Sequence, residues 1–156
     1  MLFPSRVAID ANTRNYLVNL LLPTTLTCWD LYAHLKMAHW NLKGPTFLPI
    51  HELFDELGTN INGSADKFAE RAITLGAQVF FDGNELQAAS LLPPYGRVRS
   101  VTDHLMNIIN DFQLLDTHLR SRIDETGPLD MTTQNMYIDF SESLEKQIWF
   151  LQAHLD

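Results

Sequence analysis

Apolar side chains recur every three or four residues along four long stretches of the chain, a spacing that aligns them on one face of an α-helix. These stretches predict helices at residues 10–42, 49–76, 100–125 and 130–154. No alternating, strand-like stretch is long enough to compete, so the chain is predicted to be all-α. The side chains expected to face the core are Leu17, Leu20, Leu21, Leu31, Tyr32, Leu35, Ile50, Leu53, Phe54, Leu57, Ile61, Ala65, Phe68, Ala69, Ala72, Val101, Leu105, Ile108, Phe112, Leu115, Leu119, Ile123, Tyr137, Phe140, Leu144, Ile148, Leu151 and Leu155.

Polar residues, glycines and prolines mark where the predicted helices begin and end. Asp10 or Asn12 can cap the start of the first helix, and the Gly-Pro pair at 44–45 ends it. A second Gly-Pro pair at 127–128 separates the last two helices. Pro23 lies inside the first helix and lacks a backbone donor, so we expect a kink or a break there.

Residues 77–99 form a long connection between the second and third long helices, with a short helix expected at 85–91. Four helices of similar length with one long crossover predict a ferritin-like four-helix bundle. We expect a single domain over residues 10–156, preceded by a short N-terminal extension at 1–9.

Composition narrows the class of protein. The chain has 156 residues, 46% of them hydrophobic, which is enough for a sizeable core, and a net charge of −8. Such a chain is repelled by nucleic-acid phosphates and attracts cations, although acidity often serves solubility alone. No apolar run reaches membrane-spanning length, and the N-terminus lacks the pattern of a secretion signal. With Cys28 as the single cysteine, we expect a cytoplasmic protein without internal disulfides.

Metal-binding side chains lie in a regular pattern along the second predicted helix. His51 and Asp55 are four residues apart, as are Asp66 and Glu70. On a helical wheel they fall at about 0°, 40°, 60° and 100°, on one flank beside the apolar stripe. Yet His51 and Glu70 are separated by roughly 28 Å of helix, so one straight helix cannot bring both to one metal ion.

Two copies of the helix can do so. If they pair antiparallel about a two-fold axis, His51 meets Glu70 of the partner subunit, and Asp55 meets Asp66 of the partner subunit in the same register. A two-fold dimer contains this arrangement twice. His39, near the end of the first helix, can supply another nitrogen. The alternative is that these are ordinary solvated helix positions, and the shared register alone does not decide between the two.

The expected ligands are two imidazoles and three carboxylates, which suit iron, zinc or manganese. The di-iron centre inside a single bundle needs Glu-x-x-His on two helices, and this motif is absent from the sequence. We therefore do not expect a centre within one subunit.

Three consecutive motifs resemble the signature of the Dps family, the mini-ferritins: HWNxxGxxF at 39–47, HExFD at 51–55 and DxxxER at 66–71. The stretch LEKQxWFL at 144–151 is similar to the last helix of that family. Together with the helix pattern, the resemblance covers residues 10–156.

The resemblance implies a hollow dodecamer, built from two-fold dimers, that stores ferric iron. It implies ferroxidase centres at the two-fold interfaces, where Fe(II) is oxidised by peroxide, oxygen or both, which protects against oxidative stress. Carried over by position, the metal-binding and catalytic residues are His39, His51 and Asp55 from one subunit, with Asp66 and Glu70 from its neighbour.

Trp40 resembles the aromatic residue that members keep near the centre, as an electron donor or for interface packing. His154 lies where a non-coordinating residue is more usual. As a further metal ligand, His154 would favour zinc. One alternative function is therefore a zinc-binding shell with weak ferroxidase activity.

Two other departures from the family pattern concern DNA binding and the uptake of iron. Arg6 is the only basic residue before the first helix, so we expect no DNA binding, and a DNA-coating nucleoid protector is the other alternative. Thr132 and Asn135 occupy positions where the family often places pore-lining acids. Uptake of iron would then rely on Asp130, on other nearby acids or on another route.

The remaining histidines are expected to be structural. His34 is expected to be solvated, and Cys28 to pack as a small apolar side chain. His104, Asp111 and His118 recur every seven residues, which indicates boundary positions of an amphipathic helix or a weak metal patch.

Overall fold

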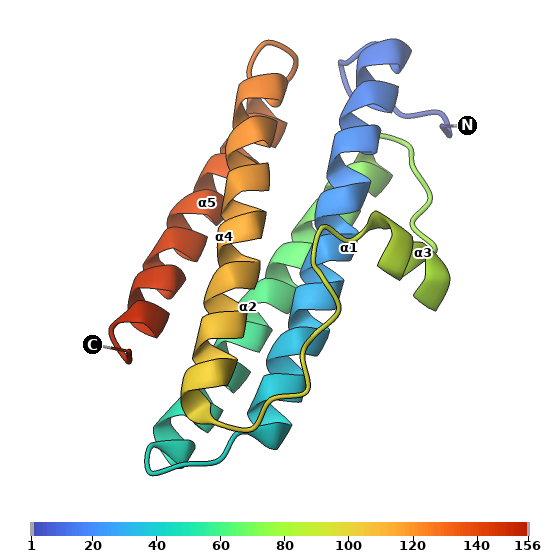
Figure 1. Cartoon of the computed structure of the whole chain (residues 1–156). Helices are drawn as coiled ribbons and strands as arrows, with labels where there is room; N and C mark the ends of the chain where they lie inside the picture. The colour runs from blue at the N-terminus through green and yellow to red at the C-terminus, as the bar shows by residue number, and fades with distance from the viewer. Residues whose placement is uncertain (1, 156) are drawn as a thin grey trace.

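The computed structural model describes residues 2–155 and contains five helices (Figure 1). Among these residues the only β-type pairing is an isolated bridge between Lys43 and Ser100. The predicted all-α, ferritin-like bundle is confirmed, as is the short helix in the crossover. The helices are α1 (Ala11–Asn41), α2 (Phe47–Thr74), α3 (Gly83–Ala89), α4 (Val101–Thr126) and α5 (Met131–Gln152).

The bundle consists of two helical hairpins, α1 with α2 and α4 with α5 (Figure 1). The crossover carries α3 beside α1 and then runs along α1 to the start of α4. The lower end of the molecule in Figure 1 therefore brings together the end of α1, the start of α2 and the start of α4.

Pro23 does not split the first helix, so of the predicted kink or split only the kink stays a prediction. The helix α1 is continuous from Ala11 to Asn41. Around the proline, the hydroxyls of Thr24 and Thr27 donate to the carbonyls of Leu20 and Pro23 at 3.2 and 2.8 Å. Packing of α1 against three other helices outweighs the loss of one backbone hydrogen bond.

The core is made of the apolar faces that the sequence indicates. Most of the expected side chains are buried, and Cys28 is fully buried among them, as expected. Leu155 is an exception, since it lies beyond the end of α5 at Gln152 and is 36% exposed. The prediction that the last helix extends to residue 154 and turns Leu155 inward was therefore wrong.

Several polar side chains are also buried, and this overturns two predictions. His34 is 3% exposed rather than solvated, and its Nδ1 lies 2.8 Å from a carboxylate oxygen of Asp111. His104 is 1% exposed, with its Nδ1 2.8 Å from the hydroxyl of Tyr95. His104 and Asp111 are thus interior residues of α4 and not boundary positions: Asp111 meets a partner from α1, and the Nδ1 of His104 meets one from the crossover.

The N-terminal extension docks on the end of α2. The backbone N–H of Phe3 donates to the carbonyl of Gly76 at 2.8 Å, and the Ser5 hydroxyl donates to the carbonyl of Thr74 at 2.9 Å. Gly76 has a φ of +104°, and a Cβ there would lie 2.5 Å from the Phe3 carbonyl oxygen. Only glycine fits this turn without displacing the extension.

Among residues 2–155, no helix combines the length and the apolar character needed to cross a bilayer.

Candidate metal centre

His39 and His51 face each other where the end of α1 meets the start of α2. Their rings are stacked, with centroids 3.6 Å apart and planes 18° from parallel. The Nδ1 of His39 lies 2.8 Å from the carbonyl oxygen of His51, and the Nδ1 of His51 lies 2.9 Å from the carbonyl oxygen of His39. Each imidazole is therefore held by the main chain of the other helix.

These reciprocal hydrogen bonds assign the tautomer of both rings. A carbonyl oxygen only accepts, so each Nδ1 must carry its proton and donate. The lone pair then lies on Nε2 of both His39 and His51. Histidines that bind metals are commonly prepared in this way, with one nitrogen donating to a carbonyl and the other left for the metal.

Two aromatic residues border the histidine pair. Phe47, one turn before His51 on α2, stacks on the His51 ring with centroids 5.0 Å apart. Trp40 directly follows His39 and is 67% exposed. Both side chains leave apolar surface uncovered next to the histidines, since Phe47 is 40% exposed.

Asp55 lies one turn after His51 and forms an ion pair with Lys36 of α1, with its Oδ1 2.6 Å from Nζ. The hydrogen bond and the charge of Lys36, and to a smaller extent the nearby His39 and His51, hold the pKa of Asp55 below its usual value. The carboxylate is thus ionised at neutral pH, and a metal would compete with Lys36 for it.

Asp66 and Glu70 lie further along α2, and both are exposed. Among residues 2–155, no three His, Cys, Asp or Glu side chains come together as a metal site in a single chain. The structure therefore brings together His39 and His51, with Asp55 nearby, but does not bring Asp66 or Glu70 to them within one subunit.

Comparison with known proteins decides the family. The family model of the ferritin-like domain matches residues 24–156. The DNA protection during starvation protein of Agrobacterium fabrum is 30% identical over 149 residues, an alignment that covers 94% of this chain and 92% of the relative. The chain belongs to the Dps family of ferritin-like proteins. The family resemblance of the sequence motifs is thereby confirmed.

Solved Dps structures share the whole fold. Mycobacterium smegmatis Dps in its tetragonal form superposes with a TM-score of 0.94 at 28% identity, over 100% of this chain and 95% of that chain. The Dps of Microbacterium arborescens, solved in a form described as high iron, has a TM-score of 0.85 at 28% identity and covers 94% and 96% of the two chains.

Three residues that we expect to depart from the Dps pattern, Thr132, Asn135 and His154, lie at the two ends of α5. His154 is exposed in the turn that follows the helix. Thr132 and Asn135 are exposed in its first turns. Asp130, one of the acids named above for iron uptake, caps α5 through the Thr133 N–H and pairs with Arg71. Its carboxylate thus has a structural role.

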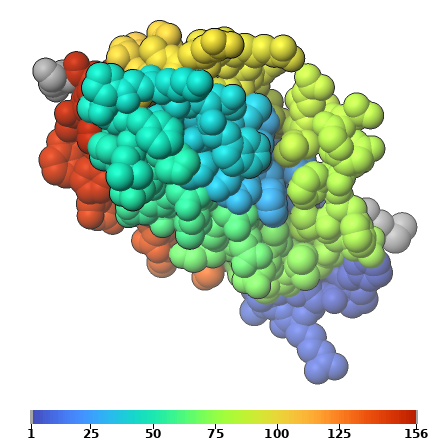
Figure 2. Space-filling model, turned by 90° about the horizontal axis from the view of Figure 1, so that it is seen from below, coloured from blue at the N-terminus to red at the C-terminus, as the bar shows by residue number. Residues whose placement is uncertain are grey.

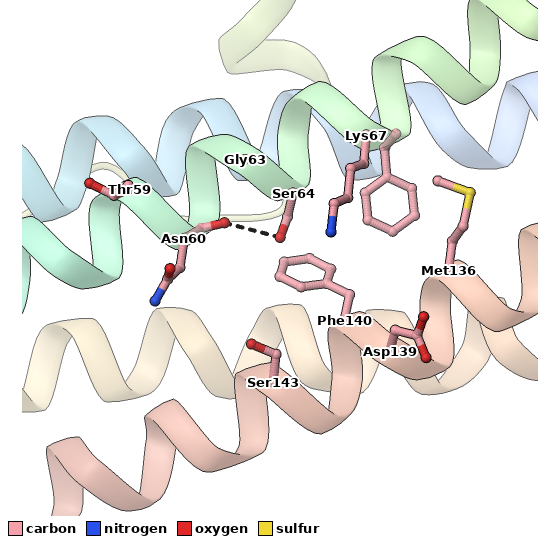
Figure 3. A pocket seen from close by; sticks show the side chains of 10 residues that line it. Thr59, Asn60, Gly63, Ser64, Lys67, Met136, Asp139, Phe140 and Ser143 are labelled. Atoms are coloured by element: carbon pink, nitrogen blue, oxygen red, sulfur yellow. Dashed lines mark hydrogen bonds between the residues drawn. The ribbon is translucent and has the colours of Figure 1, made fainter.

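A cavity of about 380 Å³ lies elsewhere, between α2 and α5 (Figure 3). Its lining combines Lys67 and Asp139 with two phenylalanines and several small polar side chains, among them Ser64, which donates to the Asn60 carbonyl at 3.1 Å. None of the five expected ligands lines it. It is therefore separate from the candidate metal centre.

The sequence analysis gave Lys36 no place at the site, and it included Phe47 only as the last residue of the HWNxxGxxF motif. The spacing contained a signal for each, since Lys36 lies three residues before His39 and Phe47 four before His51, on the faces that carry the histidines. The missing information was how α1 packs on α2, which decides what those faces touch.

Proposed function

We propose that this protein is a ferroxidase and iron store, which oxidises Fe(II) at centres shared between subunits and keeps the ferric product inside a hollow dodecamer. The observation that carries the proposal is the histidine pair, whose two Nε2 atoms are available as ligands because both Nδ1 atoms are engaged. Membership of a ferritin-like family supports the choice of iron over other metals.

The second half of each centre would come from a neighbouring subunit. In the antiparallel register described above, Asp66 and Glu70 of one subunit approach His51 and Asp55 of the other. Their exposure supports this arrangement, since both carboxylates are available to a partner. Two-fold pairing then makes two identical centres per dimer.

Each ligand has a distinct role in this scheme. His39 and His51 fix the geometry, and the carboxylates supply the negative charge that favours the ferric state. Asp55 or Glu70 is the candidate bridge between two irons. Each Fe(II) gives up one electron, and hydrogen peroxide takes two, so a pair of irons matches one peroxide. Oxygen is the other candidate oxidant.

Such a reaction would protect the cell, because Fe(II) and peroxide together generate damaging radicals. The Agrobacterium relative is named for the protection of DNA. For this chain we propose that protection comes from consuming iron and oxidant in the cytoplasm, without DNA contact, because a subunit charge of −8 repels phosphates. Zinc would act as a competing ion, with His154 as an additional candidate ligand.

The decisive experiment follows ferric absorbance after Fe(II) is mixed with the metal-free protein under peroxide and, separately, under oxygen. The double variant Asp66→Ala with Glu70→Ala is expected to lose the fast oxidation phase, because it removes both partner carboxylates from every centre.

Glu142→Ala provides the control, since it removes an exposed carboxylate from α5 and leaves the α2 ligands in place. It should retain the fast phase. If the double variant oxidises iron as fast as the unmodified protein, the assignment of the centre is wrong.

A further inference from the structure

Two large apolar side chains are exposed on the ligand-bearing flank of α2, one near each end of the helix. Leu48 is 58% exposed and Ile73 is 55% exposed. Roughly 38 Å of helix separates them, so they cannot cover each other within one subunit. Figure 2 views the end of the molecule where α1 passes into α2, and the start of α2 lies at the surface there. A single exposed leucine or isoleucine is ordinary, so the position of these two side chains decides their meaning.

The positions of the two side chains match those of the aspartates in the expected centre. On the helical wheel with His51 at 0°, Leu48 lies at about 60°, as Asp66 does, and Ile73 lies at about 40°, as Asp55 does. The register that sets Asp55 opposite the partner's Asp66 therefore also sets Leu48 opposite the partner's Ile73. Because the metal-binding residues alone defined that register, the apolar match is an independent observation.

This apolar pair would lie at the edge of each shared centre. Leu48 precedes His51 by three residues, and Ile73 follows Glu70 by three. Residues three apart on a helix are neighbours on the same face. Leu48 and the partner's Ile73 are thus one turn beyond the pair formed by His51 and the partner's Glu70, on the side away from the two-fold axis.

The helix turn that carries Ile73 is held in place by the N-terminal extension. The carbonyl of Thr74 accepts from the Ser5 hydroxyl at 2.9 Å, and the carbonyl of Gly76 accepts from the Phe3 N–H at 2.8 Å. Ile73 is therefore presented to a partner on a turn that the fold has already fixed.

An apolar contact would supply an attraction that the metal-free centre lacks. In the proposed register Asp55 faces the partner's Asp66, and two carboxylates brought close together repel each other. Lys36 pairs with Asp55 alone. Burial of apolar surface needs no metal ion, so it can hold the two copies in register before iron arrives.

We propose that Leu48 of one subunit packs against Ile73 of the partner subunit, twice in each dimer, and that this contact sets the register and closes the edge of each centre to water. The inference rests on the proposed function, from which it takes the pairing of the two helices. An ion bound behind the contact would lie in less polar surroundings, which strengthens its attraction to the carboxylates.

The test is disulfide cross-linking of the assembled, metal-free double variant Leu48→Cys with Ile73→Cys. Both positions are exposed, so the substitutions leave the core of the subunit unchanged. Cys28 is fully buried and does not compete. Mild oxidation should shift nearly all subunits to a covalent dimer on a denaturing gel without reductant, because each dimer contains the contact twice.

Leu48→Cys with Ala69→Cys is the matched control. Ala69 lies one turn before Ile73 on the same flank, which displaces the second thiol by roughly 6 Å along the helix and beyond the reach of a disulfide. This variant should stay uncross-linked, as should each single cysteine variant. Cross-linking of the control in preference to the test pair would overturn the proposal, and so would a ladder of covalent oligomers, which indicates an open head-to-tail contact.

Iron oxidation by the unmodified protein, measured separately, keeps the two proposals distinguishable. Fast oxidation by the unmodified protein without cross-linking of the test pair would overturn the apolar contact and leave the ferroxidase proposal standing. Cross-linking of the test pair without iron oxidation would support the contact and overturn the ferroxidase proposal.

Discussion

Inside the bundle, the hydroxyl of Thr24 lies between two aromatic side chains from the other hairpin. Its oxygen is 2.9 Å from Nε2 of His118 and 3.2 Å from the hydroxyl of Tyr137. Burial, and next the charge of Arg122, lowers the pKa of His118 to about 4. The folded protein therefore strongly prefers this histidine uncharged.

This preference makes His118 a source of acid sensitivity. In the unfolded chain the imidazole takes up its proton near pH 6.5, so its contribution to stability is complete above that pH and is lost as the pH falls towards 4. We expect His118→Gln to reduce the loss of unfolding free energy over this range by up to about 3 kcal/mol. Denaturant unfolding at pH 7 and at pH 4.5 measures the difference. If the unfolding free energies of the variant and the unmodified protein fall in parallel with pH, His118 is not a source of acid sensitivity.

The sequence predicted the position of a side chain correctly where residue spacing alone determines it. It failed where a residue far away in the sequence determines the position. The four-residue spacing placed Asp66 and Glu70 on one flank of α2 beside the apolar stripe, and both side chains are exposed in the structure. The prediction that His34 is solvated was wrong because its partner, Asp111, is 77 residues away in the sequence. Local periodicity holds no information on such a contact.

At the N-terminus of α5, a single carboxylate makes several interactions. The carboxylate of Asp130 accepts from the backbone N–H of Thr133 and from its hydroxyl, and it also pairs with Arg71 of α2. Burial raises the pKa of Asp130, but these hydrogen bonds and the Arg71 charge outweigh it and keep the pKa below 3.8. One carboxylate thus caps a helix and ties the two hairpins together.

We expect Asp130→Ala to lower the free energy of unfolding by about 1–3 kcal/mol, from the lost cap and the partly buried arginine left without its partner. Because the folded-state pKa is depressed, this contribution is present above about pH 4 and is lost as the pH falls through the folded-state value. Thermal unfolding at pH 7 and at pH 3 would measure both effects.

Asp130→Asn is the matched control, because it keeps an oxygen for the Thr133 N–H but removes the charge. Its free energy of unfolding at pH 7 should lie between those of Asp130→Ala and the unmodified protein. If Asp130→Ala is as stable as the unmodified protein, the carboxylate does not connect the hairpins as described.

At the level of elements, the hydrophobic period predicted each long helix to within a few residues at either end. The expected split at Pro23 does not occur, and α5 ends two residues before the predicted residue 154. A proline is tolerated in α1 because tertiary packing holds the helix on both sides of it, and packing of this kind is not encoded in local sequence.

For the whole molecule, the important feature is that each subunit brings together only part of the expected ligand set. The proposed dimer register rests on the sequence alone, because the two ligand pairs on α2 share one spacing. The contacts of Lys36 and Phe47 could not be foreseen, because they depend on how two helices dock.

Mixed assemblies test the shared centre directly. Subunits carrying His51→Ala and subunits carrying Glu70→Ala are each expected to be inactive in separate assemblies. When they are unfolded together and reassembled in equal amounts, about a quarter of the centres should combine an intact histidine side with an intact carboxylate side. The fast phase of iron oxidation should recover to that fraction. No recovery in assemblies shown to be mixed would indicate that the centre lies within one subunit.

The reciprocal bonds of His39 and His51 have a consequence for the entropy of metal capture. Immobilising a flexible side chain on binding costs about 0.5–1.5 kcal/mol, which weakens the affinity of a site by that amount. Here both rings lose their rotational freedom when α1 and α2 fold together, so an arriving ion does not have to order them. The remaining ordering falls on the exposed carboxylates, and the speed of capture should therefore depend on their motion.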